Sequence, residues 1–358
     1  MPARLFSLSS ALHHQNPLVR PRLHTPRTAS LTCPAQGLPR AGAPAPPSLP
    51  RRGGPVAKRP IPHVKRVLVV ASGKGGVGKS TVAVNLAFAL AMRAGERRLR
   101  VGLLDLDIFG PSIPKLMGLD RADEPHLTPA GALVPLTNHG IPCMSMGFLL
   151  PKSTPAPGSS ASAGSSADTP VVWRGLMVQK AVQQLLFDVD WRLGARTDAS
   201  ASGSESGSGT GTGLDVLVVD MPPGTGDVPL TLGQLVAVDG AVIVSTPQDV
   251  ALADVRKGIA MFRKVGVPIT GLLLNQSYFL CPSCDVRHDL FGSSDLFHAT
   301  ARQLGVPVLG ELPLAPEVSG SGDAGAPYAL LGGAGGGGGA RWREGLEEVA
   351  ERVWGSLG

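Results

Sequence analysis

The stretch Ser72-Gly-Lys-Gly-Gly-Val-Gly-Lys-Ser-Thr81 decides the fold. It contains the pattern G-x-x-x-x-G-K-S, follows a β-branched run at 67–71 and precedes a helical pattern at 80–94. Its glycines let the backbone approach a phosphate closely because they have no Cβ. The N–H groups of the loop and the positive end of the following helix would then bind the anion. We therefore predict a phosphate-binding loop between a strand and a helix.

Each polar side chain of this loop has an expected role in binding ATP and Mg²⁺. Lys79 is expected to reach the β- and γ-phosphates, Ser80 to ligate Mg²⁺ and Thr81 to lie near the α-phosphate. The predicted nucleotide-binding residues of the loop are Gly73, Lys74, Gly75, Gly76, Val77, Gly78, Lys79, Ser80 and Thr81.

Two further acidic stretches end predicted strands. Asp105 and Asp107 follow one apolar run, and Asp220 ends another before Met-Pro-Pro-Gly224. A single acid at a strand end is often only a helix cap, but two such sites after a phosphate loop favour a functional interpretation, because ligands bind at this edge of an open α/β sheet. Asp220 is predicted to bind Mg²⁺ through water, and Gly224 to give the following loop backbone freedom.

Lys74, a second lysine inside the loop, resembles the signature lysine of the deviant Walker A ATPases; the alternative is a solvated loop lysine. The resemblance implies a homodimer in which Lys74 contacts the partner's nucleotide and stabilises charge on the transferred phosphoryl group. It also implies that Asp107 orients the attacking water or the Mg²⁺ shell, and that Asn275 contacts adenine. With Lys74, Lys79 and Asp107 as catalytic residues and no dedicated general base visible, we expect slow ATP hydrolysis.

Short β-branched runs alternate with helical patterns from residue 67 onward. Near-continuous apolar runs indicate strands of a parallel sheet that is buried on both faces. The predicted strands are 67–71, 101–106, 216–219, 241–245, 271–274 and 306–309. The predicted helices are 80–94, 175–186, 251–265, 294–304 and 340–356, with Gly95 and Gly266 as C′ glycines. This alternation predicts an α/β fold, a doubly wound, mostly parallel sheet of the P-loop NTPase type, with a hairpin or irregular excursion at 127–150.

The pair Cys281-Pro-Ser-Cys284 allows three interpretations. A redox pair would open a helix after a strand in a small βαβ domain. A structural zinc site needs four ligands; His288 is near, but the chain has no second C-x-x-C. In the third interpretation, two chains each supply two thiolates across a two-fold axis, which gives the four ligands of a 4Fe–4S cluster.

Several blocks resemble the Mrp/Nbp iron–sulfur carrier ATPases. They are Asp107-Ile-Phe-Gly-Pro-Ser, Ser145-Met-Gly-Phe, Trp173-Arg-Gly, Asp220-Met-Pro-Pro-Gly-Thr-Gly-Asp, Thr246-Pro-Gln-Asp, Asn275, the cysteine pair and Phe291-Gly. The resemblance implies that Cys281 and Cys284 bind a 4Fe–4S cluster at a homodimer interface and that the cluster passes to apoproteins. The transit-like N-terminus is most similar to the mitochondrial branch, which implies respiratory complex I subunits as recipients.

Some residues depart from that family pattern. The N-terminal four-cysteine motif of the cytosolic members is absent: Cys33 stands alone, and Cys143 is predicted to be a buried thiol. Asn275-Gln-Ser stands where relatives usually have Asn-Met-Ser.

Charge is distributed unevenly along the chain. The first 66 residues contribute 11 lysines and arginines and no acid, so with a total of +6 the remainder sums to −5. The negative balance of residues 67–358 argues against a nucleic-acid-binding domain.

Residues 1–60 are rich in Arg, Ser and Pro, which predicts a transit peptide and linker for the mitochondrial matrix, with a plastid as the alternative.

Residues 61–358 are predicted to form the ATPase domain. Ser-, Gly- or Ala-rich inserts near 152–169, 195–213 and 332–339 are expected to be disordered surface loops. No stretch combines about 20 apolar residues with freedom from Pro, Gly and charge, so we expect no membrane insertion.

Two rival functions stay open. A MinD/ParA-like positioning ATPase would need a basic amphipathic anchor, whereas the C-terminal helix at 340–356 has acidic polar positions, and its apolar stripe is expected to pack on the sheet. The other rival is a nucleotide-gated scaffold with a structural zinc site and negligible hydrolysis.

Overall fold

The computed structural model describes residues 57–93, 98–149, 175–192, 212–331 and 337–358. The chain divides after Gly54, and everything described here belongs to the part from Pro55 onward. The predicted transit segment up to residue 56, Cys33, Gly95 and nearly all of the predicted inserts lie outside the described residues. Gly338 and Gly339, assigned from the sequence to the third insert, begin the last helix.

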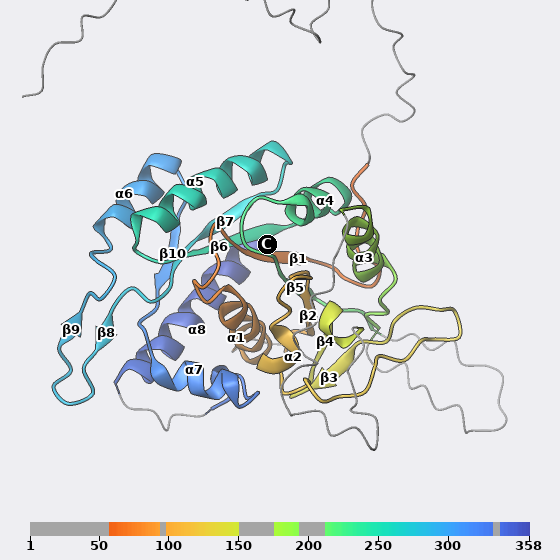
Figure 1. The fold of residues 1–358 in the computed structure, drawn as a ribbon, viewed down its shortest axis with the longest axis horizontal. Helices are drawn as coiled ribbons and strands as arrows, with labels where there is room; N and C mark the ends of the chain where they lie inside the picture. Colours follow the sequence, from red (N-terminus) through yellow and green to blue (C-terminus); the bar gives the residue numbers. More distant parts are fainter. Residues whose placement is uncertain (1–56, 94–97, 150–174, 193–211, 332–336) are drawn as a thin grey trace, which may run out of the picture. The chain divides into compact units, whose positions relative to one another are not determined.

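One eight-stranded sheet forms the centre of the fold (Figure 1). Its order is β10-β7-β6-β1-β5-β2-β4-β3, and every pairing in it is parallel except that of β3 with β4. The strands are β1 (Val67–Ser72), β2 (Val101–Asp105), β3 (Leu136–Asn138), β4 (Ile141–Ser145), β5 (Val216–Asp220), β6 (Gly240–Ser245), β7 (Ile269–Leu274) and β10 (Val308–Glu311). Every residue of β1, β2, β5 and β6 is buried, as expected for strands covered on both faces. The predicted doubly wound sheet is confirmed.

Helices cover both faces of the sheet (Figure 1). One layer holds α1 (Lys79–Met92), α2 (Ile113–Leu116), α7 (Pro316–Asp323) and α8 (Gly338–Leu357). The other holds α3 (Gly175–Phe187), α4 (Asp227–Leu235), α5 (Asp249–Lys264) and α6 (Asp295–Leu304). The apolar stripe of α8, including Trp342, Leu346 and Val349, is buried against α1 and β10. The expectation that this stripe packs on the sheet is confirmed at β10, and the stripe also packs on α1.

The stretch 127–150 contains a hairpin, but not one that stands apart from the sheet. Strand β3 turns through His139 and Gly140, both with positive φ, into β4. Strand β4 then pairs in parallel with β2, so it lies inside the sheet and is buried throughout. Helices α2, α4 and α7 were not predicted, since Pro and Gly interrupt their helical patterns. Gly266 is confirmed as a helix-ending glycine with φ +65°.

The carboxyl ends of the strands bring the predicted functional residues to one edge. β1 leads into the glycine loop, β2 ends at Asp105, and β5 ends at Asp220, which lies beside Asp105 in the register. β7 leads to a small separate hairpin of β8 (Phe279–Leu280) and β9 (Arg287–His288). The sheet therefore gathers the glycine loop, the acids and the start of the cysteine segment along one edge.

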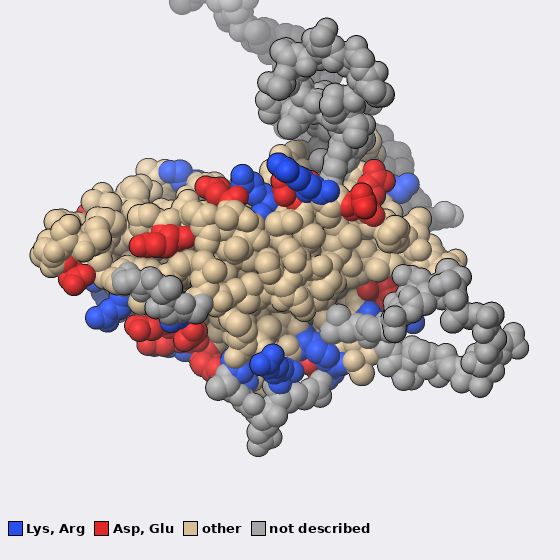
Figure 2. Space-filling model, turned by 90° about the horizontal axis from the view of Figure 1, so that it is seen from below, with Lys and Arg blue, Asp and Glu red and all other residues tan. Residues whose placement is uncertain are grey.

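The surface seen in Figure 2 carries mixed charge. Among the described residues drawn there, acidic and basic side chains are interspersed, and no single basic surface dominates. Within the described ranges, no helix is both long enough and apolar enough to span a bilayer.

Candidate functional site

The glycine loop adopts a conformation that specific glycines make possible. Gly76 and Gly78 have φ values of +79° and +80°, a region that favours glycine. A Cβ on Gly73 would lie 2.6 Å from the backbone of Asp254 in α5, so Gly73 permits the loop to pack against that helix. The loop is also held locally, since Ser72 Oγ donates to the Lys74 carbonyl at 2.9 Å.

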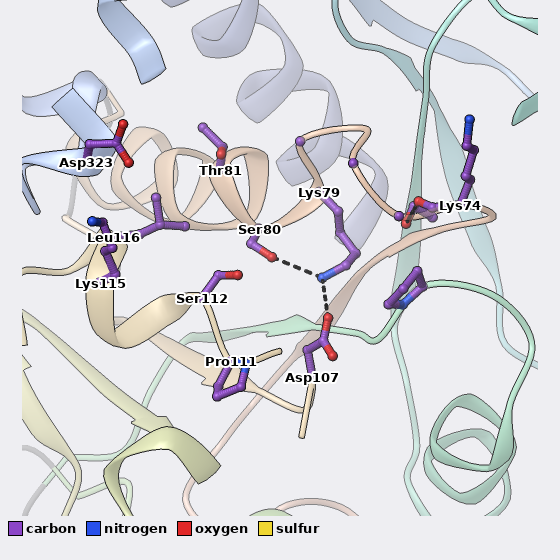
Figure 3. A pocket seen from close by; sticks show the side chains of 15 residues that line it. Lys74, Lys79, Ser80, Thr81, Asp107, Pro111, Ser112, Lys115, Leu116 and Asp323 are labelled. Atoms are coloured by element: carbon purple, nitrogen blue, oxygen red, sulfur yellow. Dashed lines mark hydrogen bonds and ion pairs between the residues drawn. The ribbon is translucent and has the colours of Figure 1, made fainter. Parts of the chain in front are cut away.

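Lys79 lies at the centre of the site (Figure 3). Its side chain is 6% exposed, and its Nζ lies 2.5 Å from Asp220 Oδ1, 3.1 Å from Ser80 Oγ and 3.9 Å from Asp107 Oδ2. The structure thus brings together four predicted site residues from three separate stretches of sequence: Lys79 and Ser80 from the glycine loop, Asp107 and Asp220. A phosphate placed here would meet a buried cation and the start of α1 at once.

The acids of the site are shifted toward their protonated forms. Burial raises the pKa of Asp220, and the Lys79 ammonium opposes that shift. Burial likewise raises the pKa of Asp107, again against Lys79. Asp220 Oδ2 is buried and has no hydrogen-bond partner among the described residues. An orphaned carboxylate oxygen beside Ser80 fits a Mg²⁺ ion with bound water, because Mg²⁺ takes oxygen ligands and keeps several waters.

Asp105 has a larger part in the site than the sequence indicated. Its fully buried carboxylate accepts hydrogen bonds from Asp107 N at 2.9 Å, Ile113 N at 3.3 Å and Ser145 Oγ at 2.9 Å. It therefore fixes both ends of the loop 107–113. Burial, with the charge of Asp220, raises the pKa of Asp105 to about 8. The pattern Asp-x-Asp after a buried strand was visible, but its partner Ser145 is 40 positions away.

A pocket of about 470 Å³ opens above these groups. Its lining includes the predicted loop residues Lys74, Gly75, Gly76, Gly78, Lys79, Ser80 and Thr81, together with Asp107. Lys115 on α2 and Asp323 on α7 also line it. Neither residue was predicted for the site, because neither belongs to a motif and the sequence did not predict α2 or α7.

Lys74 and Asn275 take different places around the loop. Lys74 is exposed, and in Figure 3 its side chain extends away from the Lys79 ammonium. Asn275 is 6% exposed, and its Nδ2 donates to the Val77 carbonyl at 2.8 Å. Val77 itself is buried. Asn275 thus contacts the backbone of the phosphate loop, while its predicted contact with adenine stays a prediction.

The cysteine pair lies in the turn between β8 and β9. Cys281 N donates to the Val286 carbonyl at 3.0 Å, and Asp285 N donates to the Cys281 carbonyl at 2.8 Å. Asp285 has a φ of +53°, which closes the turn. Cys281 is half-buried and Cys284 is exposed. The backbone N–H of Ser283, with the thiol and N–H of Cys284, lowers the pKa of the Cys281 thiol and favours the thiolate that a metal requires.

The described part of one chain supplies only these two thiols to the turn. Within that part, no group of three or more His, Cys, Asp or Glu side chains could hold a metal ion, so His288 does not complete a site with the pair. Cys143 is fully buried, and burial raises the pKa of its thiol to about 12. It is the buried thiol predicted from the sequence and does not contribute to the turn.

Comparison with known proteins identifies relatives over most of the chain. A model of the ParA group, described as NUBPL iron-transfer P-loop NTPase, matches residues 63–194 and 210–335. The "Iron-sulfur cluster transfer protein NUBPL" of Mus musculus is 48% identical over 279 residues, which cover 78% of this chain and 75% of that protein. The Arabidopsis thaliana "Iron-sulfur protein required for NADH dehydrogenase, mitochondrial" is 42% identical, with 78% of this chain and 76% of that protein covered.

Solved structures share the fold. A nucleotide-binding protein of Archaeoglobus fulgidus in complex with ADP is 32% identical, with a TM-score of 0.56 and coverage of 74% of this chain and 88% of that one. A chain of the MinC:MinD cell division protein complex of Aquifex aeolicus matches with a TM-score of 0.50 over 81% of this chain and 96% of that one. At 16% identity, this second match shows the fold alone.

Proposed function

The chain belongs to the NUBPL iron-transfer P-loop NTPase family, and on that premise we propose that it is an ATP-dependent carrier that binds an iron–sulfur cluster and transfers it to apoproteins. The mouse relative is named for cluster transfer, and a relative from Aquifex aeolicus, 40% identical, is named "Iron-sulfur cluster carrier protein". The geometry of the cysteine turn supports the same function.

The cargo is a 4Fe–4S cluster held between the Cys281 and Cys284 pairs of two copies. The observation that carries this proposal is the solvent-facing turn, which offers two thiols and no third ligand from the described residues. Four thiolates are what such a cluster requires, and a two-fold axis doubles one pair into four. The cluster is therefore bound at a homodimer interface.

The glycine loop binds ATP, and the cation that accompanies it is Mg²⁺. Ser80 and the orphaned oxygen of Asp220 would hold Mg²⁺, which would neutralise charge on the phosphates. Lys79 contacts the phosphates, and Asn275 contacts adenine, as the family resemblance implies. Asp107 orients the attacking water, and Lys74 reaches the partner's nucleotide. Hydrolysis is slow, because none of the described residues of the site is a dedicated base.

The recipients are subunits of respiratory complex I, and the site of action is the mitochondrial matrix, with a plastid as the alternative. The name of the Arabidopsis relative refers both to NADH dehydrogenase and to mitochondria. The basic, acid-free segment 1–60 acts as the transit peptide and linker. Neither nucleic acid nor stable membrane insertion is part of this function.

A positioning ATPase of the MinD/ParA type is less well supported. The apolar stripe of α8, which such a protein would need for an anchor, is buried within the domain. The likeness to MinD extends to the fold alone.

Anaerobic reconstitution tests the proposal. The wild-type chain is expected to bind iron and sulfide and to form a dimer of native mass two subunits plus one cluster. Cys281→Ala should abolish the chromophore and leave ATP binding intact, because Cys281 lies outside the nucleotide pocket. Cys33→Ser, which also removes one thiol, should retain the full chromophore. A chromophore as intense in Cys281→Ala as in the wild type would contradict the proposal that Cys281 binds the cluster.

A further inference from the structure

A short stretch of chain joins the phosphate loop to the cysteine turn. Residues 275–280, here called the connecting segment, begin where β7 ends and stop immediately before Cys281. Asn275 and Cys281 are six positions apart, which limits the distance between their Cα atoms to about 20 Å.

The first end of the connecting segment contacts the backbone of the phosphate loop. Asn275 Nδ2 donates to the Val77 carbonyl at 2.8 Å. The same amide nitrogen lies so close to Gly78 that a Cβ there would be 2.4 Å from it. A displacement of the loop backbone at residues 77–78 must therefore displace the Asn275 side chain as well.

The middle of the connecting segment is held firmly against the chain that follows β10. The Leu312 carbonyl accepts from Ser277 N at 2.9 Å and from Ser277 Oγ at 3.1 Å, and Leu314 N donates to the Tyr278 carbonyl at 2.6 Å. Ser277 is fully buried. These contacts join the segment to residues 312–314 and leave it little freedom to bend at Ser277 and Tyr278, so the segment is stiff there.

The second end of the connecting segment becomes the first strand of the cysteine hairpin. Phe279 and Leu280 pair with His288 and Arg287. The Arg287 guanidinium also stacks over the Tyr278 ring, 4.3 Å from its centre. The hairpin is thus tied to the connecting segment on both of its strands.

Gln276 marks the one backbone position in this segment with a left-handed conformation. Its φ is +54°, although it is not glycine. A residue keeps such a strained backbone conformation only where contacts with the surrounding structure hold it in place, and such residues are common at switching sites. Here the chain changes direction between the contact with the phosphate loop and the buried anchor at Ser277.

We propose that the connecting segment transmits nucleotide occupancy of the phosphate loop to the cysteine turn, with Asn275 as the positioning residue that senses the loop. Phosphate bound by the loop N–H groups shifts the Val77 carbonyl, and the stiff segment carries that shift to Cys281. The proposal deepens the proposed function, because it gives the carrier a physical route by which ATP changes access to the thiols.

The test measures thiol access in cluster-free protein. In a Cys33→Ser background, alkylation of Cys281 and Cys284 by iodoacetamide is followed by mass spectrometry with and without saturating Mg²⁺–ADP. The nucleotide is expected to change the labelling rate at least threefold. The buried Cys143 serves as the internal control and should remain unlabelled. Equal labelling rates with and without Mg²⁺–ADP would overturn the proposal.

Two variants at one position sharpen the test. Gln276→Gly frees the backbone at the bend and should reduce the nucleotide response by at least half, with nucleotide affinity unchanged. Gln276→Ala removes the same side chain but keeps a Cβ, so it should retain the response. A full response in Gln276→Gly overturns the proposal.

Hydrogen exchange of residues 281–286 in the unsubstituted chain provides a readout that needs no variant. Bound nucleotide should change the exchange rate of these amides, and identical rates would contradict the proposal. Because the protein contains no cluster in either assay, a failure of cluster binding is seen separately, in the reconstitution experiment.

Discussion

At the scale of single residues, the glycines of the phosphate loop are not interchangeable. Gly78 has a positive φ, and a Cβ there would strike the Asn275 amide. Gly75 lines the pocket, has no positive φ, and would place a Cβ no closer than 4.0 Å to Pro223. The fold therefore requires glycine at position 78, whereas position 75 requires glycine only if a ligand approaches the backbone there.

Alanine at these two positions should therefore separate binding from stability. Gly75→Ala should weaken ATP binding at least about tenfold, close to 1.4 kcal/mol, and leave the free energy of unfolding unchanged. Gly78→Ala should lower that free energy by roughly 1–2 kcal/mol from left-handed strain alone. Titration with a fluorescent ATP analogue and urea unfolding measure the two quantities. Normal ATP affinity in Gly75→Ala would show that no phosphate approaches residue 75.

At the scale of elements, the Asp215 carboxylate links the amino-terminal ends of β1, β2 and β5. These ends lie on the side of the sheet opposite the nucleotide pocket. Asp215 precedes β5 and accepts from Lys65, before β1, at 3.0 Å. It also accepts from the Arg100 guanidinium, before β2, at 2.9 and 3.0 Å. Hydrogen bonds from Arg100 hold the pKa of Asp215 well below its usual range. The ion pairs fix the relative positions of adjacent strands far from the nucleotide.

Stability should depend on pH through this carboxylate. Asp215→Asn is expected to lower the free energy of unfolding at pH 7 by about 2 kcal/mol, as for hydrogen bonds to charged groups. Because the folded-state pKa is depressed, the contribution is full above the unfolded-state pKa of about 3.9 and is lost as pH falls below it. The difference between variant and wild type should therefore shrink from pH 5 to pH 2.

Urea unfolding across that pH range makes the measurement. Asp120→Asn, at an exposed carboxylate with no ion pair to another described residue, is the matched control and should differ little from wild type at any pH. A variant difference for Asp215→Asn that stays constant down to pH 2 would argue against the depressed pKa.

At the scale of the whole molecule, the described part of one copy lacks components that the proposed chemistry needs. The Lys74 side chain extends away from the Lys79 ammonium of its own chain (Figure 3), and the cysteine turn has two thiols where a cluster needs four. In the proposed homodimer, the second copy would supply the other two thiols and a lysine to the partner's nucleotide.

Mixing two inactive variants tests whether Lys74 acts in the partner's site. Lys74→Ala and Lys79→Ala should each lose ATP hydrolysis. After subunit exchange, a mixed dimer contains one site with an intact Lys79 and an intact Lys74 from the partner. Activity should then return to about one quarter of wild type, since half of the dimers are mixed and half of their sites are intact. Phosphate release that stays at the background level after exchange would place Lys74 in its own site or outside catalysis.

The sequence by itself determined the phosphate loop, the main strands and helices, and the cysteine pair. These features depend on residues within a few positions of one another, where backbone propensity and apolar periodicity act. Only the tertiary structure decided that Lys79 pairs with Asp220 across 141 positions, that Asp105 accepts from Ser145, and that β4 lies inside the sheet. Strand order, register and burial arise from packing of the whole chain, and no local pattern contains them.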